Sequence, residues 1–170
     1  GNAAAAICLA AILGLSDEAL RAALAELTLP GQRSKLDIHG GVTWFNDAYN
    51  ANPESMAALL ALLAERDWAK QAGRLHLALG DMREMNQDGP QFHADLLRLA
   101  RQKLPAAILY PVGPAMATAA AALGITGYAD VTSARAALHA AIHPGDTVAL
   151  KASRGMALEG LLPGAPTASH

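Results

Sequence analysis

The side chains best suited to binding a ligand follow the apolar run of residues 42–45. The run ends in the sequence Asn-Asp-Ala-Tyr-Asn-Ala-Asn-Pro at residues 46–53, which supplies amides, a carboxylate and a phenol. Asp47 can accept two hydrogen bonds from a vicinal diol such as a ribose, and Tyr49 can stack on a base. In the alternative interpretation Asp47 makes an Asx turn and Tyr49 only covers the sheet. This cluster holds more hydrogen-bonding groups than a turn requires, which favours a binding site.

Two further polar groups also come directly after apolar runs. One is Gly80-Asp81 with Arg83 and Glu84, and the other is Lys151 with Ser153 and Arg154. The carboxyl ends of parallel strands share one edge of a sheet, where ligands bind, so three polar loops there indicate a site rather than three solvated loops. Lys151 and Arg154 lie near an expected helix start, where backbone N–H groups favour a carboxylate or phosphate. The alternative is a surface ion pair that contributes little to stability.

The elements that must position these groups follow from hydrophobic periodicity and turn residues. Residues 2–13 and 16–27 predict two helices, and Gly40-Gly41 between two short apolar runs predicts a β-hairpin. Further helices are expected over residues 53–66, 90–103, 115–123 and from Thr132 or Ser133 to 142, and strands over 75–79, 106–110, 127–129 and 147–150, with a short helix near Arg154. Strands that alternate with helices of this length predict a doubly wound, mainly parallel α/β sheet.

The chain divides near Pro30 into an N-terminal helical hairpin, residues 1–30, and a complete α/β domain, residues 31–162, followed by a loop-like tail, residues 163–170. The 170 residues carry a formal net charge of −2, which gives no basic stripe for nucleic acid. The single cysteine, Cys8, cannot form an intramolecular disulfide, which fits a reducing compartment. Since residues 3–13 are too few to cross a bilayer, we expect a cytoplasmic protein.

The histidines give weaker signals. His76 alternates with Leu75 and Leu77 and is expected to point to the opposite face of the sheet. His93 lies on a helix near the Asp81 loop and can approach the site, although a lone helical histidine is usually a surface or packing residue. The sequence contains no zinc-ligand spacing, no G-x-x-x-x-G-K-[ST] loop and no G-x-G-x-x-G after a strand, so it cannot cradle a triphosphate in the P-loop way.

Three motifs together resemble those of the Mur ligases. They are the run at residues 46–53, then Leu79-Gly80-Asp81-Met82, then Lys151-Ala152-Ser153-Arg154-Gly155-Met156. Their order and spacing are most similar to the family member that adds D-alanyl-D-alanine to UDP-MurNAc-tripeptide, which typically shows D-D-x-Y-N-A-N-P, G-D-M and K-G-S-R. Gly1-Asn2 and residues 30–33 also resemble the end of the family's central ATPase domain and its hinge.

The resemblance implies part of an ATP-dependent amide ligase of peptidoglycan synthesis. In such a ligase ATP phosphorylates the terminal carboxylate of UDP-MurNAc-tripeptide, and the amine of D-alanyl-D-alanine attacks the acyl phosphate. Residues 1–30 then correspond to the last helices of the central ATPase domain and residues 31–162 to the C-terminal Rossmann-like domain. The P-loop and the Mg²⁺-binding residues of the family lie in the central domain and the UDP-sugar is held mainly by the N-terminal domain. This chain alone is therefore expected to hold no catalytic or metal-binding residue and to be inactive.

By position, the resemblance also implies two sets of site residues. The ATP-binding set is Arg33 near the phosphates, Asp47 on the ribose, and Tyr49, Asn50 and Asn52 beside the adenosine. The set on the side of the acceptor, D-alanyl-D-alanine, is Lys151, Ser153 and Arg154. Asn46 stands where the family commonly has Asp, and Ala152 replaces the usual Gly, which would restrict the loop. Residues 83–86 depart from the common Glu-Leu-Gly continuation and receive no role.

Three alternatives stay open at this point: a sister amide ligase that adds another amino acid, a folylpolyglutamate synthase, and a nucleotide-binding module without chemistry. The Tyr-Asn-Ala-Asn-Pro string argues against the first two. A P-loop domain upstream in the parent reading frame would exclude the third. The third residue of the stem peptide, the affinities and the oligomeric state do not follow from this sequence.

Overall fold

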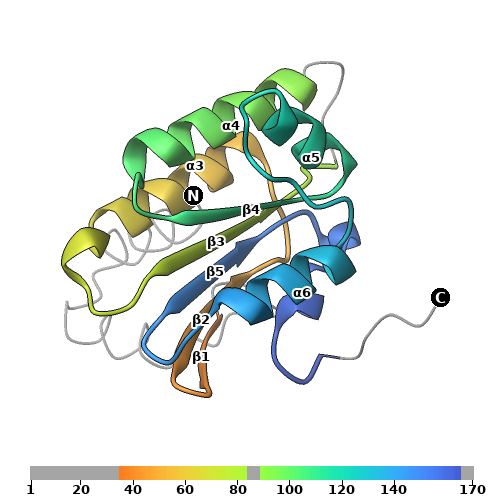
Figure 1. Cartoon of the computed structure of the whole chain (residues 1–170). Helices are drawn as coiled ribbons and strands as arrows, with labels where there is room; N and C mark the ends of the chain where they lie inside the picture. Colours follow the sequence, from red (N-terminus) through yellow and green to blue (C-terminus); the bar gives the residue numbers. More distant parts are fainter. Residues whose placement is uncertain (1–34, 84–88, 166–170) are drawn as a thin grey trace, which may run out of the picture. The chain divides into compact units, whose positions relative to one another are not determined.

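The computed structural model describes residues 35–83 and 89–165, which form a five-stranded sheet with helices on both faces (Figure 1). The predicted helices at residues 2–13 and 16–27, the site residue Arg33, Glu84 and the end of the tail lie outside the described residues. The strand order is β1-β2-β5-β3-β4. The prediction of a doubly wound, mainly parallel α/β sheet is confirmed.

The sheet begins with the predicted hairpin. β1 (Lys35–His39) pairs antiparallel with β2 (Val42–Asp47). Gly40 and Gly41, with φ of 59° and 78°, form the turn between them. Two-residue hairpin turns whose twist matches that of the strands require positive φ, which glycine adopts without steric cost.

The other strand pairings are parallel. β5 (Thr147–Lys151) lies between β2 and β3 (Leu75–Gly80), and β4 (Ile108–Val112) completes the sheet beside β3. Every residue of β3 is buried, as a central strand covered on both faces requires. Because β2, β5, β3 and β4 run in the same direction, their carboxyl ends meet at one edge of the sheet.

Helices complete the two outer layers. The described helices are α3 (Pro53–Ala64), α4 (Gly89–Lys103), α5 (Pro114–Ala121) and α6 (Val131–Ala141), with 3-10 turns η1 (Trp68–Lys70), η2 (Arg154–Met156) and η3 (Leu158–Leu161). α3, α4 and α5 cover one face of the sheet, and α6 covers the other (Figure 1). Within the described part of the chain, every helix falls short of the length and hydropathy that a bilayer crossing needs.

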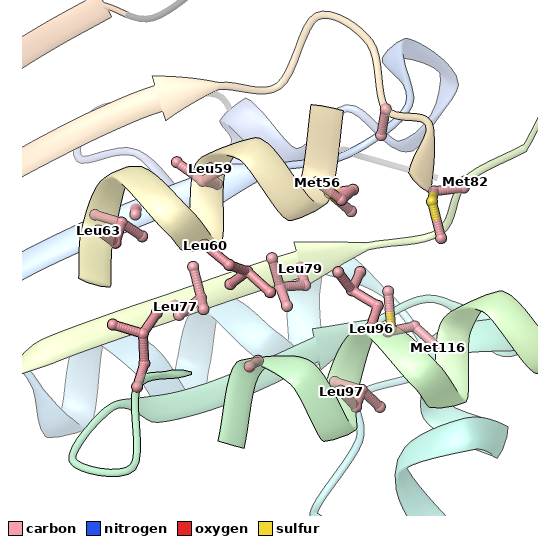
Figure 2. Packing of buried hydrophobic residues seen from close by; sticks show 14 of the residues in the cluster. Met56, Leu59, Leu60, Leu63, Leu77, Leu79, Met82, Leu96, Leu97 and Met116 are labelled. Atoms are coloured by element: carbon pink, nitrogen blue, oxygen red, sulfur yellow. The ribbon is translucent and has the colours of Figure 1, made fainter. Parts of the chain in front are cut away.

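Each face of the sheet has its own apolar core. Figure 2 shows the first, in which α3 contributes Met56 and Leu60, β3 contributes Leu77, and α4 contributes Leu96 and Leu97. The second core packs α6 and η3 against the other face and includes Trp44, Ala78, Val148, Leu138 and Leu158. A fully buried leucine stabilises the fold by roughly 1.5–3 kcal/mol, so these two clusters supply the main driving force for folding.

Three predicted elements need correction. The helix from Thr132 or Ser133 begins at Val131, because Asp130 is its N-cap and its carboxylate accepts a hydrogen bond from Ser133 N at 2.7 Å. Asp is a better N-cap than Thr, and its oxygen reaches the third amide of the helix. The strand expected over residues 127–129 is only an isolated bridge between Val112 and Tyr128.

The third correction concerns the strand expected over residues 106–110. It begins two residues later as β4 and continues through Pro111 to Val112. Pro111 lies in an edge strand, where a missing N–H is tolerated. The carboxyl end of β4 therefore lies two residues further along the chain than the apolar pattern predicts.

A buried hydrogen-bond network lies at the amino ends of β3 and β5 and joins His76, Tyr110 and Asp146. His76 is fully buried on the face opposite Leu75 and Leu77, as predicted. Its Nδ1 lies 3.0 Å from the hydroxyl of Tyr110, and its Nε2 lies 3.1 Å from Oδ2 of Asp146. Since an ionised carboxylate only accepts, Nε2–H donates to Asp146 and Nδ1 accepts from Tyr110. Burial lowers the pKa of His76 and raises the pKa of Tyr110 to about 12, so both side chains are neutral.

Asp146 is the charged member of this network. Burial by itself raises its pKa, but hydrogen bonds from the backbone amides of Arg74 and His143 and from the His76 ring outweigh this and lower the pKa to about 2. The amide of Arg74 donates to Oδ1 at 2.7 Å, and the amide of His143 donates to Oδ2 at 2.8 Å. One carboxylate therefore fixes the residues that precede both β3 and β5.

The network predicts a pH dependence of stability. We expect Asp146→Asn to lower the free energy of unfolding near pH 7 by about 2 kcal/mol, because a carboxyl whose pKa decreases this much on folding stabilises the ionised folded state by that amount. The deficit should be complete above about pH 4 and shrink as the pH falls toward 2, where protonation removes the wild-type advantage. Urea unfolding of both chains near pH 7 and near pH 3 measures it. An equal deficit at the two pH values would contradict this assignment.

Candidate functional site

The three predicted polar loops lie together at the carboxyl edge of the sheet. Asp47 at the end of β2 pairs in register with Lys151 at the end of β5. On its other side, Lys151 pairs in register with Leu79 of β3. Ser153 N donates to the carbonyl of Asp81 at 3.2 Å and ties the loop after β5 to the loop after β3. The prediction that these groups share one edge is confirmed.

The loop after β2 is shaped by its own amide side chains. Asn46 Oδ1 accepts from the Ala48 amide at 3.1 Å, and Asn50 Oδ1 accepts from the Ala51 amide at 2.8 Å. Asn52 is the N-cap of α3, as predicted, and forms a capping box with Ser55. These contacts set the direction of the loop and the start of the helix. The contacts of Asn50 and Asn52 with adenosine stay predictions.

Lys151 is the most enclosed charge at this edge. Its Nζ donates to Oδ2 of Asp47 at 2.6 Å and to the carbonyl of Asn50 at 3.0 Å. The lysine side chain is 4% exposed and that of Asp47 is 20% exposed. The surface ion pair considered as an alternative is therefore a largely buried pair, in which loss of either partner costs far more than at an exposed site.

Arg154 makes the second link between the loops after β5 and β2. Its guanidinium carbon lies 5.2 Å from the centre of the half-buried Tyr49 ring, and the arginine side chain is exposed. A guanidinium over an aromatic face is attracted by the ring and keeps its N–H donors in the plane around it. Arg154 is thus an exposed cation that contacts the face of the Tyr49 ring.

Asp81 has a structural role that sequence reasoning missed. Its Oδ1 accepts from the Met116 amide at 2.7 Å and its Oδ2 from the Ala115 amide at 3.3 Å, so it caps α5 across 34 and 35 residues. Gly113, with φ of 110°, allows this, because a Cβ there would lie 2.6 Å from the carboxyl carbon of Asp81. The only local signal was Gly113-Pro114, a helix start whose first amides need an acceptor from elsewhere.

The segment after Asp81 is held by side chains from two other elements. Ser153 Oγ accepts from the Arg83 amide at 2.9 Å. The buried ring of His93 accepts from the Met82 amide through Nε2 at 3.0 Å and donates from Nδ1 to the carbonyl of Gly89 at 2.6 Å. His93 therefore reaches this edge only through the backbone of Met82. The contacts of Lys151 and Ser153 with the acceptor stay predictions, and both side chains have partners within the domain.

Ala152 fits the loop in spite of its departure from the family motif. The residue is fully buried, and a Cβ built on Gly80 would lie 2.5 Å from the Ala152 Cβ. The methyl group of Ala152 therefore occupies space that Gly80 leaves open in the neighbouring strand. The expectation that Ala152 restricts the loop stays a prediction.

The chemistry available at this edge is binding. Lys151 and Arg154 supply positive charge, Asp47 supplies a carboxylate and Tyr49 an aromatic ring. Within residues 35–83 and 89–165, no three His, Cys, Asp or Glu side chains are grouped so that they could hold a metal ion. Such an edge can orient a nucleoside and an anion.

Comparison with known proteins identifies the class. Residues 32–154 match the glutamate ligase domain of the Mur ligases. They include the first two motifs in full and the third as far as Arg154, without Gly155 and Met156. The chain therefore belongs to the Mur ligase family.

Individual relatives point to a particular member of that class. The chain is 32% identical over 169 residues to UDP-N-acetylmuramoyl-tripeptide–D-alanyl-D-alanine ligase of Treponema pallidum. The alignment covers 95% of this chain and 36% of the relative. MurF from Acinetobacter baumannii is 28% identical with a TM-score of 0.76, over 94% of this chain and 35% of that protein. The chain thus spans about 36% of the length of the curated relative.

The alternative that the chain belongs to a folylpolyglutamate synthase has weaker support. The bifunctional folylpolyglutamate synthase/dihydrofolate synthase of Yersinia pestis is 21% identical with a TM-score of 0.58, over 85% of this chain and 33% of that enzyme. This likeness concerns the fold alone. The match to the D-alanyl-D-alanine ligases is closer in both identity and superposition.

The cap made by Asp81 gives a test of its structural role. We expect Asp81→Ala to lower the free energy of unfolding by about 1–2 kcal/mol, because the first amides of α5, one buried and one partly buried, lose their acceptor. Asp95→Ala is the matched control, since Asp95 pairs with Arg98 in an exposed i,i+3 pair and should change stability by less than about 0.5 kcal/mol. Denaturant unfolding of the three chains measures this. A loss at Asp81 no larger than at Asp95 would exclude the capping role.

Proposed function

We propose that this chain is the C-terminal domain of an ATP-dependent ligase that adds D-alanyl-D-alanine to UDP-N-acetylmuramoyl-tripeptide in peptidoglycan synthesis. The observation that carries the proposal is the carboxyl edge, where the loops after β2 and β5 join through the Lys151–Asp47 pair and the Arg154–Tyr49 stack. Residues of two family motifs meet there, in a chain 32% identical to a ligase of that name.

The rest of the machinery belongs to the domains that precede this one in the relatives. Residues 1–30 are assigned to the end of the central ATPase domain and residues 31–162 to the C-terminal domain. The sequence contains no P-loop, and we assign the phosphate-binding lysine and the Mg²⁺ ligands to the central domain, as the family resemblance implies. The full-length ligase acts in the cytoplasm.

The reaction joins a carboxylate to an amine after ATP has converted the carboxylate into an acyl phosphate, and inorganic phosphate leaves when the amide forms. On the nucleotide side, Asp47 accepts hydrogen bonds from the ribose hydroxyls, and Tyr49, Asn50 and Asn52 lie beside the adenosine. The family resemblance assigns Arg33 to the phosphates. These contacts hold the nucleotide in one orientation, which lowers the entropic cost of phosphoryl transfer.

On the acceptor side, the exposed guanidinium of Arg154 binds the carboxylate of D-alanyl-D-alanine. Arginine can do this through two parallel hydrogen bonds, which fix the direction of the dipeptide and leave its amine free to attack. Because Arg154 stacks on Tyr49, the acceptor lies next to the loop that carries the nucleotide contacts. Ser153 supports this loop through its contact with the Arg83 amide.

A phosphate-release assay on the full-length ligase tests the function. We expect release only when ATP, UDP-MurNAc-tripeptide and D-alanyl-D-alanine are all present, because the amine is needed to discharge the acyl phosphate. The 170-residue chain alone should release none above background, since its sequence contains no P-loop to hold the transferring phosphoryl group. Release that depends on glutamate instead of the dipeptide would favour a folylpolyglutamate synthase. Absence of release from a folded full-length protein that binds ATP would favour a nucleotide-binding module without chemistry.

The role of Arg154 can be separated from that of the nucleotide contacts. In the full-length ligase, Arg154→Lys should raise the KM for D-alanyl-D-alanine by about tenfold, because lysine cannot make the bidentate contact, and should leave the KM for ATP within about twofold. Arg98→Lys, in an exposed pair with Asp95, is the matched control and should change neither constant. Steady-state kinetics with each substrate varied in turn decides the matter. A wild-type KM for the dipeptide in Arg154→Lys would refute the assignment.

A further inference from the structure

The ammonium group of Lys151 is directed at the loop after β2. Both of its hydrogen-bond acceptors, Oδ2 of Asp47 and the carbonyl of Asn50, belong to the segment that leads from β2 to α3. Lys151 itself ends the central strand β5, whose backbone is fixed by pairing with β2 and β3. Lys151 therefore links the paired strand β5 to the loop after β2.

Burial gives this arrangement its strength. The side chain of Lys151 is only 4% exposed, so its charge depends on these two acceptors for the solvation that water would otherwise provide. The 2.6 Å distance to Asp47 is typical of a strong charge-assisted hydrogen bond. The contact with Asn50 fixes a backbone carbonyl, and the backbone on either side carries Tyr49 and the N-cap Asn52.

A purely structural role does not account for a lysine at this position. Replacing both members of a buried ion pair by apolar residues of similar volume is often neutral or stabilising, so stability alone does not require an ion pair at this position. What an apolar residue cannot do is hold the Asp47 carboxylate in one rotamer and the Asn50 carbonyl in one orientation. Both groups belong to the loop assigned to the nucleotide.

We propose that Lys151 is a positioning residue for the nucleotide, which acts by holding Asp47 and the Asn50 backbone in place. This rests on the proposed function, in which the loop after β2 binds ATP. The family resemblance implies that Lys151 lies on the acceptor side. The proposal instead assigns it to the nucleotide side. Arg154, three residues further along the chain, keeps its role toward the acceptor. Of the two cations in this motif, Lys151 then acts on the ATP side and Arg154 on the D-alanyl-D-alanine side.

The test compares Lys151→Met in the full-length ligase with Asp47→Asn and with the double variant. Lys151→Met should raise the KM for ATP by about tenfold and leave the KM for D-alanyl-D-alanine within about twofold, since its contacts are all on the nucleotide loop. The double variant should raise the KM for ATP by less than the product of the two single effects, because Lys151 acts through Asp47. Lys70→Met, in an exposed pair with Asp67, is the matched control.

A merely structural lysine would lower kcat through loss of folded enzyme and leave the KM for ATP unchanged, and that result would overturn the proposal. A raised KM for D-alanyl-D-alanine with a normal KM for ATP would also overturn it and place Lys151 on the acceptor side. If Lys151→Met does not fold, Lys151→Gln, which keeps a donor without the charge, carries the same test. Titration of the full-length protein with ADP gives a binding constant that does not depend on turnover. Failure of the wild type to ligate would therefore refute the proposed function alone, whereas equal ADP affinity in wild type and the lysine variant would refute the role of Lys151.

Discussion

The parallel register of β5 is the constraint on which this domain depends. Because β5 pairs with β2 on one side and β3 on the other, Lys151 lies level with Asp47 and with Leu79. The described contacts between the loops after β2, β3 and β5 then join segments that begin within a residue or two of that level. A shift of β5 by one residue would turn Lys151 to the other face of the sheet and separate it from Asp47.

Most of the fold could be predicted because its signals are local. Gly40-Gly41 marks the hairpin, Asn52-Pro53 marks the start of α3, and the apolar runs give β3 and β5 within a residue. The wrong prediction for the start of α6 also has a local cause. Asp130 is a better N-cap than Thr132, so the helix begins at Val131. The short run over residues 127–129 has too few residues to form a strand without a partner ladder, and only one bridge remains.

The site was less predictable, because its decisive contacts join residues far apart in the chain. The sequence identifies Asp47, Asp81 and Lys151 as polar groups at strand ends, but only the packing distinguishes them. Asp81 caps a helix 34 residues away, whereas Lys151 reaches back 104 residues to Asp47. Residue type and spacing therefore predict where a ligand edge lies, and the three-dimensional partners decide which of its charges serve the scaffold.

The stack of Arg154 on Tyr49 has a thermodynamic consequence. A ligand that moves the tyrosine ring must also move the guanidinium that lies over it, so the two sides of the edge are not independent. Under the proposed function, the free energy of binding of each substrate then contains a term that depends on the other. Linkage of this kind is reciprocal: whatever factor the nucleotide applies to the affinity for the dipeptide, the dipeptide must apply to the affinity for the nucleotide.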